Sequence, residues 1–293
     1  MKLPLYTVDA FSSKTFGGNP AAVVPTKQKL SEDVQQKIAM ELNISETAFV
    51  VPLGVDSFNS SRFSLRWFTP TNEVPLCGHA TLSAAHVLFH CLGNTCAVIE
   101  FETLSGILLA RRSGEYIILD FPANSPGLLT QEESVAVAPL IEAVTMKASG
   151  DARLEVEEVQ LSKTTKKLLV RLKDTCPRNK LENLVVDSSK LLQVHDGSLV
   201  KGIILTLRGN KSNGDYHALS RYFAPWNGIP EDPVTGSAHT VLGPYWCKVL
   251  GEKQLNCYQC SLRGGGIKVT IRDDGRVDLA GKSVTVIKGH ITI

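Results

Sequence analysis

The sequence RWFTPTN at residues 66–72 recurs as RYFAPWN at residues 221–227, with four of seven residues unchanged. Further along both copies, CGHA at residues 77–80 meets TGSA at residues 235–238. Two matches in the same order, each followed by an apolar segment, are typical of an internal duplication. We therefore interpret the chain as two homologous halves joined near residues 115–125.

Each copy has the same local pattern: an apolar strand, a turn with Pro and Asn, and a small-residue motif that opens a helix. Pro75 falls opposite Pro230, so a three-residue insertion in the second copy is expected to follow these prolines. The first helix is predicted over residues 78–92, with Gly93 as its C-terminal stop. Its apolar residues fall on nearly every face, so we expect it to be buried all round.

The second helix is predicted from Ser237 towards Leu250, with Gly251 as its stop. Pro244 lies inside it, and we expect a kink or a break there because proline removes a backbone donor. Alternation of apolar and polar residues predicts strands elsewhere, over residues 62–67, 115–119, 166–172 and 283–287.

A surface helix is predicted from Ser31 to Leu42. Ser31 can cap it, and Glu32 and Asp33 suit the positive end of the helix dipole. Its apolar stripe consists of Val34, Ile38, Ala39 and Leu42. The simplest architecture for all these elements is α+β, with two halves that each curl a sheet around one buried helix and with a cleft between the halves.

Composition restricts the partners. The 293 residues carry 31 basic and 29 acidic side chains, a net charge of +2, so we expect neither nucleic acid nor a membrane surface as a partner. The N-terminal residues lack the apolar stretch of a secretory signal, and no run approaches the ~18 apolar residues of a membrane span. Seven cysteines in no regular framework are typical of free thiols, which favours a cytoplasmic protein.

Gly78 and Gly236 begin the two predicted buried helices, where the first-turn N–H groups have no intrahelical partner. Two such helix ends facing one cleft would bind a carboxylate or a phosphate, because free donors and the positive end of the dipole both favour an anion. His79 and Ser237, at equivalent positions, would add side-chain donors. The alternative is that these residues only cap their helices, but their matched positions favour a shared substrate-binding site.

Two acidic residues are further candidates. Asp232 would accept a hydrogen bond from a ligand amine or hydroxyl, or it is an ordinary turn residue before proline. Glu46 is either a solvated surface residue or an acid–base group. In the second case, its apolar surroundings are expected to raise its pKa by desolvation. The residues alone do not decide between these alternatives.

Signals for metal ions and nucleotide cofactors are weak. Cys257 and Cys260 form a single C-x-x-C pair, and His86 with His90 lacks the glutamate of a metalloprotease motif. The glycines at residues 264–266 fit neither P-loop nor Rossmann spacing. We therefore assign no metal site and expect no cofactor.

Several longer motifs occur along the chain in a set order: DAF and FGGNPA at residues 9–11 and 16–21, SETAF at 45–49, PLCGHAT at 75–81, and EDPVTGSA at 231–238. In these motifs the sequence resembles the PhzF family, the phenazine-biosynthesis-like isomerases of the diaminopimelate epimerase superfamily. The resemblance implies two pseudo-symmetric halves, each a β-barrel-like sheet around a central helix. The first half would comprise residues 1–118 with returning strands at 279–293, and the second residues 119–278.

The resemblance also implies a cofactor-free proton-shift enzyme that acts on a small carboxylate-bearing metabolite, usually as a homodimer. In the family, the glutamate that matches Glu46 moves the proton. Residues that match His79, Asp232 and Ser237 assist it or hold the substrate, and Asn19 matches an asparagine of the cleft.

Cys77 limits the mechanism. Epimerases of the superfamily use two cysteines, one from each half, as acid and base, but the counterpart of Cys77 is Thr235, whose hydroxyl is far too weak an acid. We therefore favour chemistry by Glu46 alone, with the helix N-termini stabilising negative charge on the substrate. The alternatives are an amino-acid epimerase or lyase, and a non-catalytic binding or protein-interaction protein that retains the fold.

Overall fold

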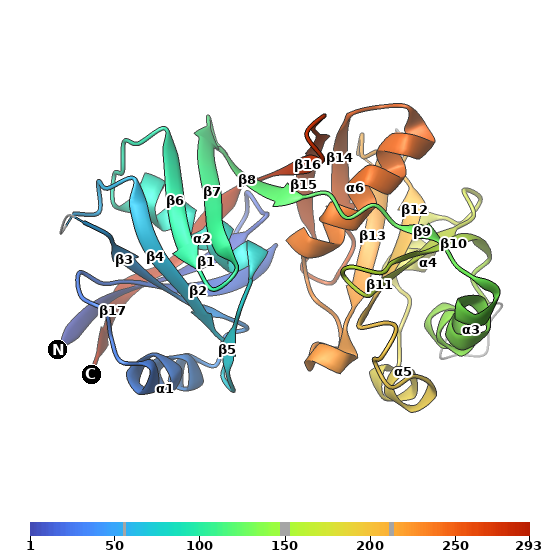
Figure 1. Cartoon of the computed structure of the whole chain (residues 1–293), viewed down its shortest axis with the longest axis horizontal. Helices are drawn as coiled ribbons and strands as arrows, with labels where there is room; N and C mark the ends of the chain where they lie inside the picture. The colour runs from blue at the N-terminus through green and yellow to red at the C-terminus, as the bar shows by residue number, and fades with distance from the viewer. Residues whose placement is uncertain (55–56, 147–152, 211–213) are drawn as a thin grey trace. The chain divides into compact units, whose positions relative to one another are not determined.

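The chain forms two compact units in the structure, a computed structural model (Figure 1). Unit 1 comprises Met1–Phe121 and Asp278–Ile293, and unit 2 comprises Pro122–Val277. The structure describes all residues except 55–56, 147–152 and 211–213. In the described part of the chain, no helix combines the length and the apolar character needed to cross a membrane.

The described part of unit 1 consists mainly of strands, with two helices. Its elements are β1 (Lys2–Ala10), β2 (Asn19–Pro25), α1 (Glu32–Leu42), β3 (Thr47–Pro52), β4 (Arg62–Phe68), β5 (Glu73–Val74), α2 (Gly78–His86) with a π-helical turn (Val87–Cys91), β6 (Val98–Thr103), β7 (Gly106–Ser113), β8 (Tyr116–Pro122) and β17 (Ser283–Thr292).

Unit 2 has a similar strand pattern and more helices. Its elements are β9 (Gly127–Leu128), α3 (Gln131–Thr145), β10 (Val156–Ser162), β11 (Lys167–Leu172), α4 (Arg178–Glu182), α5 (Ser188–Val194), β12 (Gly202–Arg208), β13 (Ala218–Phe223), a 3₁₀ turn (Pro225–Asn227), α6 (Gly236–Leu250), β14 (Gln254–Gln259) and β15 (Gly265–Ile271). The following strand, β16 (Arg276–Gly281), leads back to unit 1.

The two units repeat one order of strand pairings. In unit 1, β1 pairs antiparallel with β2, β2 parallel with β3, β3 antiparallel with β4, β4 parallel with β6, and β6 antiparallel with β7. The strands β10 to β15 of unit 2 repeat this alternation in the same order. The α+β class with two similar halves, predicted from the duplicated sequence, is confirmed.

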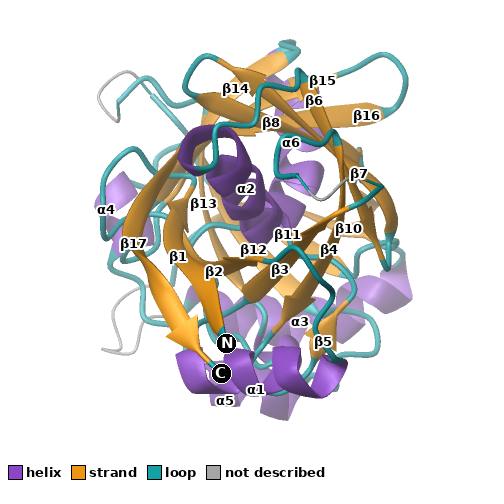
Figure 2. Ribbon diagram, turned by 90° about the vertical axis from the view of Figure 1, so that its left-hand side faces the viewer, coloured by secondary structure: helices purple, strands orange, loops and turns teal. Residues whose placement is uncertain are grey.

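Helix α2 is the centre of unit 1, and Figure 2 shows it surrounded by strands. Its residues from His79 to His86, and the next three along the chain, are buried, as the apolar residues on every face predicted. The helix ends before Gly93, which has the positive φ of +70° expected of a C-terminal stop. The π-helical turn before it was not predicted.

Helix α6 occupies the equivalent place in the chain of unit 2 and packs against β11, β14 and β15. Of the kink or break predicted at Pro244, the break was wrong, because α6 runs from Gly236 to Leu250 without interruption. Proline deprives the carbonyl of Thr240, four residues earlier, of its helical donor. The backbone N–H of Asn124 donates to that carbonyl at 2.9 Å, and the Asn124 side chain donates to Thr240 Oγ1. This substitute donor accounts for the continuous helix.

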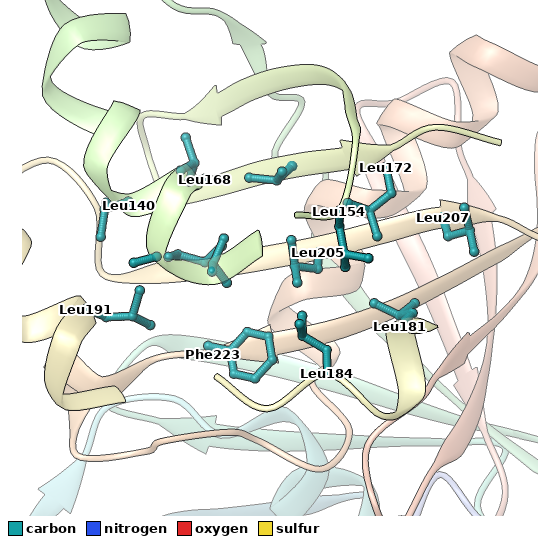
Figure 3. Close-up of a cluster of buried hydrophobic side chains, with 14 of the residues drawn as sticks. Leu140, Leu154, Leu168, Leu172, Leu181, Leu184, Leu191, Leu205, Leu207 and Phe223 are labelled. Atoms are coloured by element: carbon teal, nitrogen blue, oxygen red, sulfur yellow. The ribbon is translucent and has the colours of Figure 1, made fainter. Parts of the chain in front are cut away.

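Apolar clusters cover the other faces of the strands. In unit 1, α1 packs Ile38 and Ala39 against Phe49 and Phe68, and Ser31 caps the helix as predicted. In unit 2, leucines of α3, α4 and α5 pack on β11, β12 and β13 (Figure 3). Each unit therefore has a helix in its interior and one or more helices outside it.

The duplication includes a charged contact as well as strands. Arg66 forms two hydrogen bonds to Glu73, at 2.6 and 2.5 Å, and Arg221 does the same with Glu231, at 2.7 and 2.6 Å. Each guanidinium also lies 5.0 Å from the ring of the phenylalanine two residues later. The planar guanidinium of arginine binds a carboxylate through two hydrogen bonds, which fixes the orientation of both groups. The same contact in both units therefore identifies equivalent positions of the repeat.

These pairs correct the predicted register of the repeat. Because Glu73 matches Glu231, the three-residue insertion precedes the glutamates. Pro75 is therefore the counterpart of Pro233, and not of Pro230 as the sequence match suggested. The backbone agrees, since Val74 pairs with Trp67 and Asp232 donates its N–H to the carbonyl of Tyr222, the residue that matches Trp67.

A substitution at Gly281 tests how closely the side chains around α2 are packed. A Cβ at this position would lie 2.5 Å from Phe11 Cδ1 and 2.8 Å from Leu82 Cδ2, so the substitution Gly281→Ala forces neighbouring side chains to move. We expect the free energy of unfolding to fall by about 1–3 kcal/mol, measured by urea denaturation. The matched control is Gly289→Ala, where a Cβ meets nothing within 4 Å. Equal stability of the two variants would contradict the enclosed packing.

Candidate active site

Glu46 lies directly before β3, and its backbone carbonyl accepts a hydrogen bond from the N–H of Ala22 on β2 at 2.9 Å. This contact fixes the start of β3 against its parallel neighbour. Only 8% of the residue is exposed, so Glu46 is not the solvated surface residue that the sequence left open. A buried carboxylate needs a partner that compensates for lost hydration.

His79, in the first turn of α2, is that partner. Its Nε2 lies 3.0 Å from Glu46 Oε2, and 7% of the residue is exposed. Asn19 Nδ2 lies 3.2 Å from His79 Nδ1, and the hydroxyl of Ser45 lies 3.4 Å from Nε2. The ring is therefore held from both nitrogens.

Cys77 completes the group from the position before the helix. Its sulfur lies 3.4 Å from His79 Nδ1 and 4.0 Å from Nε2. Burial raises the pKa of the Cys77 thiol, and the negative charge of Glu46 raises it further. The thiol is therefore protonated near neutral pH.

The charges of Glu46 and His79 depend on each other. Burial alone would raise the pKa of the Glu46 carboxyl, but the facing charge of His79 and the hydrogen bonds around the carboxylate hold it below its usual value. Burial alone would lower the pKa of His79, whereas its contacts and hydrogen bonds with Cys77 and Glu46 raise that pKa above its usual value. Since Cys77 remains a neutral thiol, Glu46 supplies the charge, and the resting site is a carboxylate–imidazolium pair.

The predicted pKa shift of Glu46 was therefore wrong in direction. The prediction included desolvation, which acts as expected, but did not include an imidazolium 3.0 Å away. In that protonation state both ring nitrogens of His79 donate, so the Asn19 amide, whose Nδ2 lies 3.2 Å from Nδ1, has to turn its oxygen toward the ring.

Gly78 stands between Cys77 and His79 as the first residue of α2. Cys77 is in the N-cap position without a side-chain cap hydrogen bond, so the first turn keeps N–H groups without intrahelical partners. The side-chain hydroxyls of Thr81 and Ser83 instead bond the carbonyls of Cys77 and His79, at 2.6 and 2.9 Å. The start of α2 thus carries both Cys77 and His79. The positive end of the helix dipole has no side-chain cap there.

In unit 2, Asp232 belongs to a separate network at the start of α6. Thr235, the N-cap residue, donates its hydroxyl to Asp232 Oδ2. Gln259 links the two: its amide nitrogen donates to the carbonyl of Asp232 at 2.6 Å, and its oxygen accepts from the N–H of Thr235 at 2.9 Å. Gly236 follows as the first helical residue and Ser237 is exposed.

Each unit thus gathers some of the residues named from the sequence. Unit 1 brings together Asn19, Glu46, Gly78 and His79, and unit 2 brings together Asp232, Gly236 and Ser237. Sequence reasoning missed Ser45, Cys77 and Gln259 as members of these groups. The position of Cys77 opposite Thr235 was the available signal, but it was used only to exclude a two-thiol mechanism.

The weak metal signals of the sequence do not form a common site. Cys257 and Cys260 are buried free thiols, and His86 hydrogen-bonds Thr285 with its Nε2 at 3.0 Å. Among the described residues, one group of three potential metal ligands lies close together, and it consists of Glu46, Cys77 and His79.

Known proteins of similar sequence cover the whole chain. The family model of PhzC-PhzF, described as phenazine biosynthesis-like protein, matches residues 8–289. The phenazine biosynthesis-like domain-containing protein of Bos taurus is 50% identical, with all of both chains covered. An uncharacterized isomerase of Halalkalibacterium halodurans is 38% identical, again over the full length of both chains.

Solved structures show the same fold. A PhzF family protein from Enterococcus faecalis superposes with a TM-score of 0.82 at 35% identity, with both chains fully covered. A probable proline racemase from Agrobacterium radiobacter K84 has a TM-score of 0.58 at 10% identity, over 99% of this chain and 93% of its own, and shares the fold alone. The predicted diaminopimelate-epimerase-like architecture is confirmed, and the chain belongs to the PhzC-PhzF family of phenazine biosynthesis-like proteins.

Proposed function

We propose that this protein is a cofactor-independent isomerase that moves a proton on a small carboxylate-bearing substrate, with Glu46 as the acid–base group. The observation that carries the proposal is the buried ion pair of Glu46 and His79. The similarity of the whole chain to an uncharacterized isomerase supports the reaction class.

Glu46 acts first as a base. Its pKa lies below the usual value, so it is a carboxylate at neutral pH and accepts a proton from a substrate carbon. It then returns the proton to another carbon of the same substrate, which completes an isomerisation without an external oxidant or reductant. His79, protonated throughout, compensates the buried charge and orients the carboxylate.

Negative charge that develops on the substrate needs donors in fixed positions. We assign this role to the first turn of α2 at Gly78, where N–H groups and the helix dipole are available. Gly236 and Ser237 begin α6 in the same way and are assigned to the substrate carboxylate. Asp232, oriented by Thr235 and Gln259, is assigned to a substrate amine or hydroxyl.

The substitution Glu46→Gln tests the proposal. Purified protein is incubated in heavy water with pooled cellular carboxylates, and deuterium on carbon is read by mass spectrometry. Wild type should label at least one compound, and the variant should do so at least about 100-fold more slowly, since the amide cannot accept the proton. The matched control Glu41→Gln, on the exposed surface of α1, should label as wild type does. Equal labelling by Glu46→Gln and wild type, with both folded by circular dichroism, would exclude Glu46 as the base.

The pH profile of labelling follows from the two pKa shifts. Glu46 is ionised above its lowered pKa and His79 is protonated below its raised pKa, so the active pair persists between these two values. We expect a plateau through neutral pH, a fall on the alkaline side as His79 loses its proton, and a fall in acid below the usual range of a glutamate. Labelling that instead increases as pH rises through the His79 pKa would contradict the charge assignment.

The pairing can also be measured without a substrate. NMR titration of the histidine rings should give His79 a pKa well above 6.5, and Glu46→Gln should lower it because the compensating charge is lost. His86 is the internal control, since burial and its neighbour His90 lower its pKa to about 4 and Glu46 is not among the causes. An unchanged His79 pKa in the variant would show that the pair does not form.

A further inference from the structure

Glu46, Cys77 and His79 offer three different ligand atoms at one place. A carboxylate oxygen, a sulfur and an imidazole nitrogen lie within 4.8 Å of one another. Cys77 and His79 flank Gly78 at the start of α2, and Glu46 precedes β3, so two separate elements of unit 1 supply them. We call this set the ligand triad.

Two of the three distances within the ligand triad are close to those of a tetrahedral ion site, and the third is at most 4.8 Å. Zinc bound at about 2.3 Å to sulfur and about 2.0 Å to nitrogen and oxygen holds S and N about 3.5 Å apart, and N and O about 3.3 Å apart. Cys77 Sγ lies 4.0 Å from His79 Nε2, and that nitrogen lies 3.0 Å from Glu46 Oε2. Both separations differ from the ideal values by about half an ångström or less.

The surroundings of the triad also fit a cation. Each of the three residues is at most 8% exposed, and Glu46 Oε2 forms no hydrogen bond in the described part of the chain although it lies at ion-pair distance from His79. Asn19 contacts His79 at Nδ1, which leaves Nε2 as the ligand atom and supplies the outer partner that metal-bound histidines have. A bound ion would replace the imidazolium as the positive charge that faces the carboxylate oxygen.

The ligand types select the class of ion. Magnesium and calcium prefer sites made of oxygen, whereas thiolate and imidazole favour zinc and similar metals. In unit 2, Thr235 stands in the place of Cys77 and Ser237 in the place of His79. Strand pairing identifies the counterpart of Glu46: Ile203 pairs with Phe223 as Thr47 pairs with Phe68, so the residue before Ile203, Gly202, matches Glu46. The repeat therefore predicts such a site in unit 1 and not at the matching positions of unit 2.

We propose that Glu46, Cys77 and His79 bind one thiophilic divalent cation such as Zn²⁺, and that the bound ion blocks proton transfer by Glu46. Binding releases one proton from the thiol and one from the imidazolium to solvent, and the ion exchanges hydration water for the three protein ligands. The ion is a reversible inhibitor and not a cofactor, because it occupies the base. The inhibitory part rests on the proposed function, whereas binding itself does not.

The binding test uses reduced, metal-free full-length protein with Zn²⁺ alone and Co²⁺ alone as probes. Calorimetry should give one equivalent of zinc, and cobalt should give a near-ultraviolet thiolate-to-metal charge-transfer band. Cys77→Ser should abolish the band and weaken binding at least about 10-fold, and His79→Gln should weaken binding to a similar degree. Glu46→Gln should weaken binding but keep the band, since the thiolate remains.

The matched control is Cys91→Ser. Cys91 lies near His86 and His90 in the same unit, with its sulfur 3.3 Å from Thr285 Oγ1, so it reports on a competing thiol–imidazole site. The Cys91→Ser variant should bind zinc and cobalt as wild type does. An equal band in Cys77→Ser and wild type, loss of the band in Cys91→Ser, or no metal bound by wild type would each overturn the proposal.

The inhibition is tested separately, by adding zinc to the deuterium-labelling reaction. Zinc should suppress labelling by wild type in proportion to the occupied site. Unchanged labelling at full occupancy would overturn the inhibitory role and leave the binding site intact. Absence of labelling by metal-free protein would count against the proposed function, while the cobalt spectra would still decide on the ligand triad.

Discussion

A carboxylate and an imidazolium are stable in a protein interior only as a pair, and much of unit 1 serves the pair formed by Glu46 and His79. Loss of either partner leaves a buried charge uncompensated, which typically costs several kcal/mol. The pair therefore requires that β3 and the start of α2 keep a fixed separation. The parallel contact of β2 with β3 and the enclosure of α2 by strands provide that rigidity.

Much of the fold follows from local sequence patterns. Alternating apolar residues predicted strands that the structure contains, and one helix begins after Ser31 and another ends before Gly93, where expected. The failures have a common physical origin, because they depend on distant partners. At Pro244 the carbonyl that proline leaves without a helical donor is bonded by Asn124, far away in sequence, and the repeat register depends on which glutamate each arginine binds.

The candidate site was less predictable than the fold. Gly78 and His79 could be named because they repeat as Gly236 and Ser237. Glu46 could not be chosen from its neighbours in sequence, since burial of a glutamate is decided by whether tertiary structure supplies an opposite charge. Because the sequence does not show which charged side chain faces Glu46, the direction of its pKa shift was predicted wrongly. For the same reason Cys77 was not named, since its role depends on its contacts with Glu46 and His79.

The two copies share their framework and differ in their reactive groups. The forked arginine–glutamate contact and the order of strand pairings are kept in both, but the place of Glu46 is taken by Gly202. A Cβ there would lie 2.1 Å from the hydroxyl oxygen of Tyr222, so the phenol now fills the space beside the strand. A side chain at residue 202 therefore requires Tyr222 to move as well. The difference between the two copies is thus held by a pair of residues, so that a change at position 202 alone does not recreate the arrangement around Glu46.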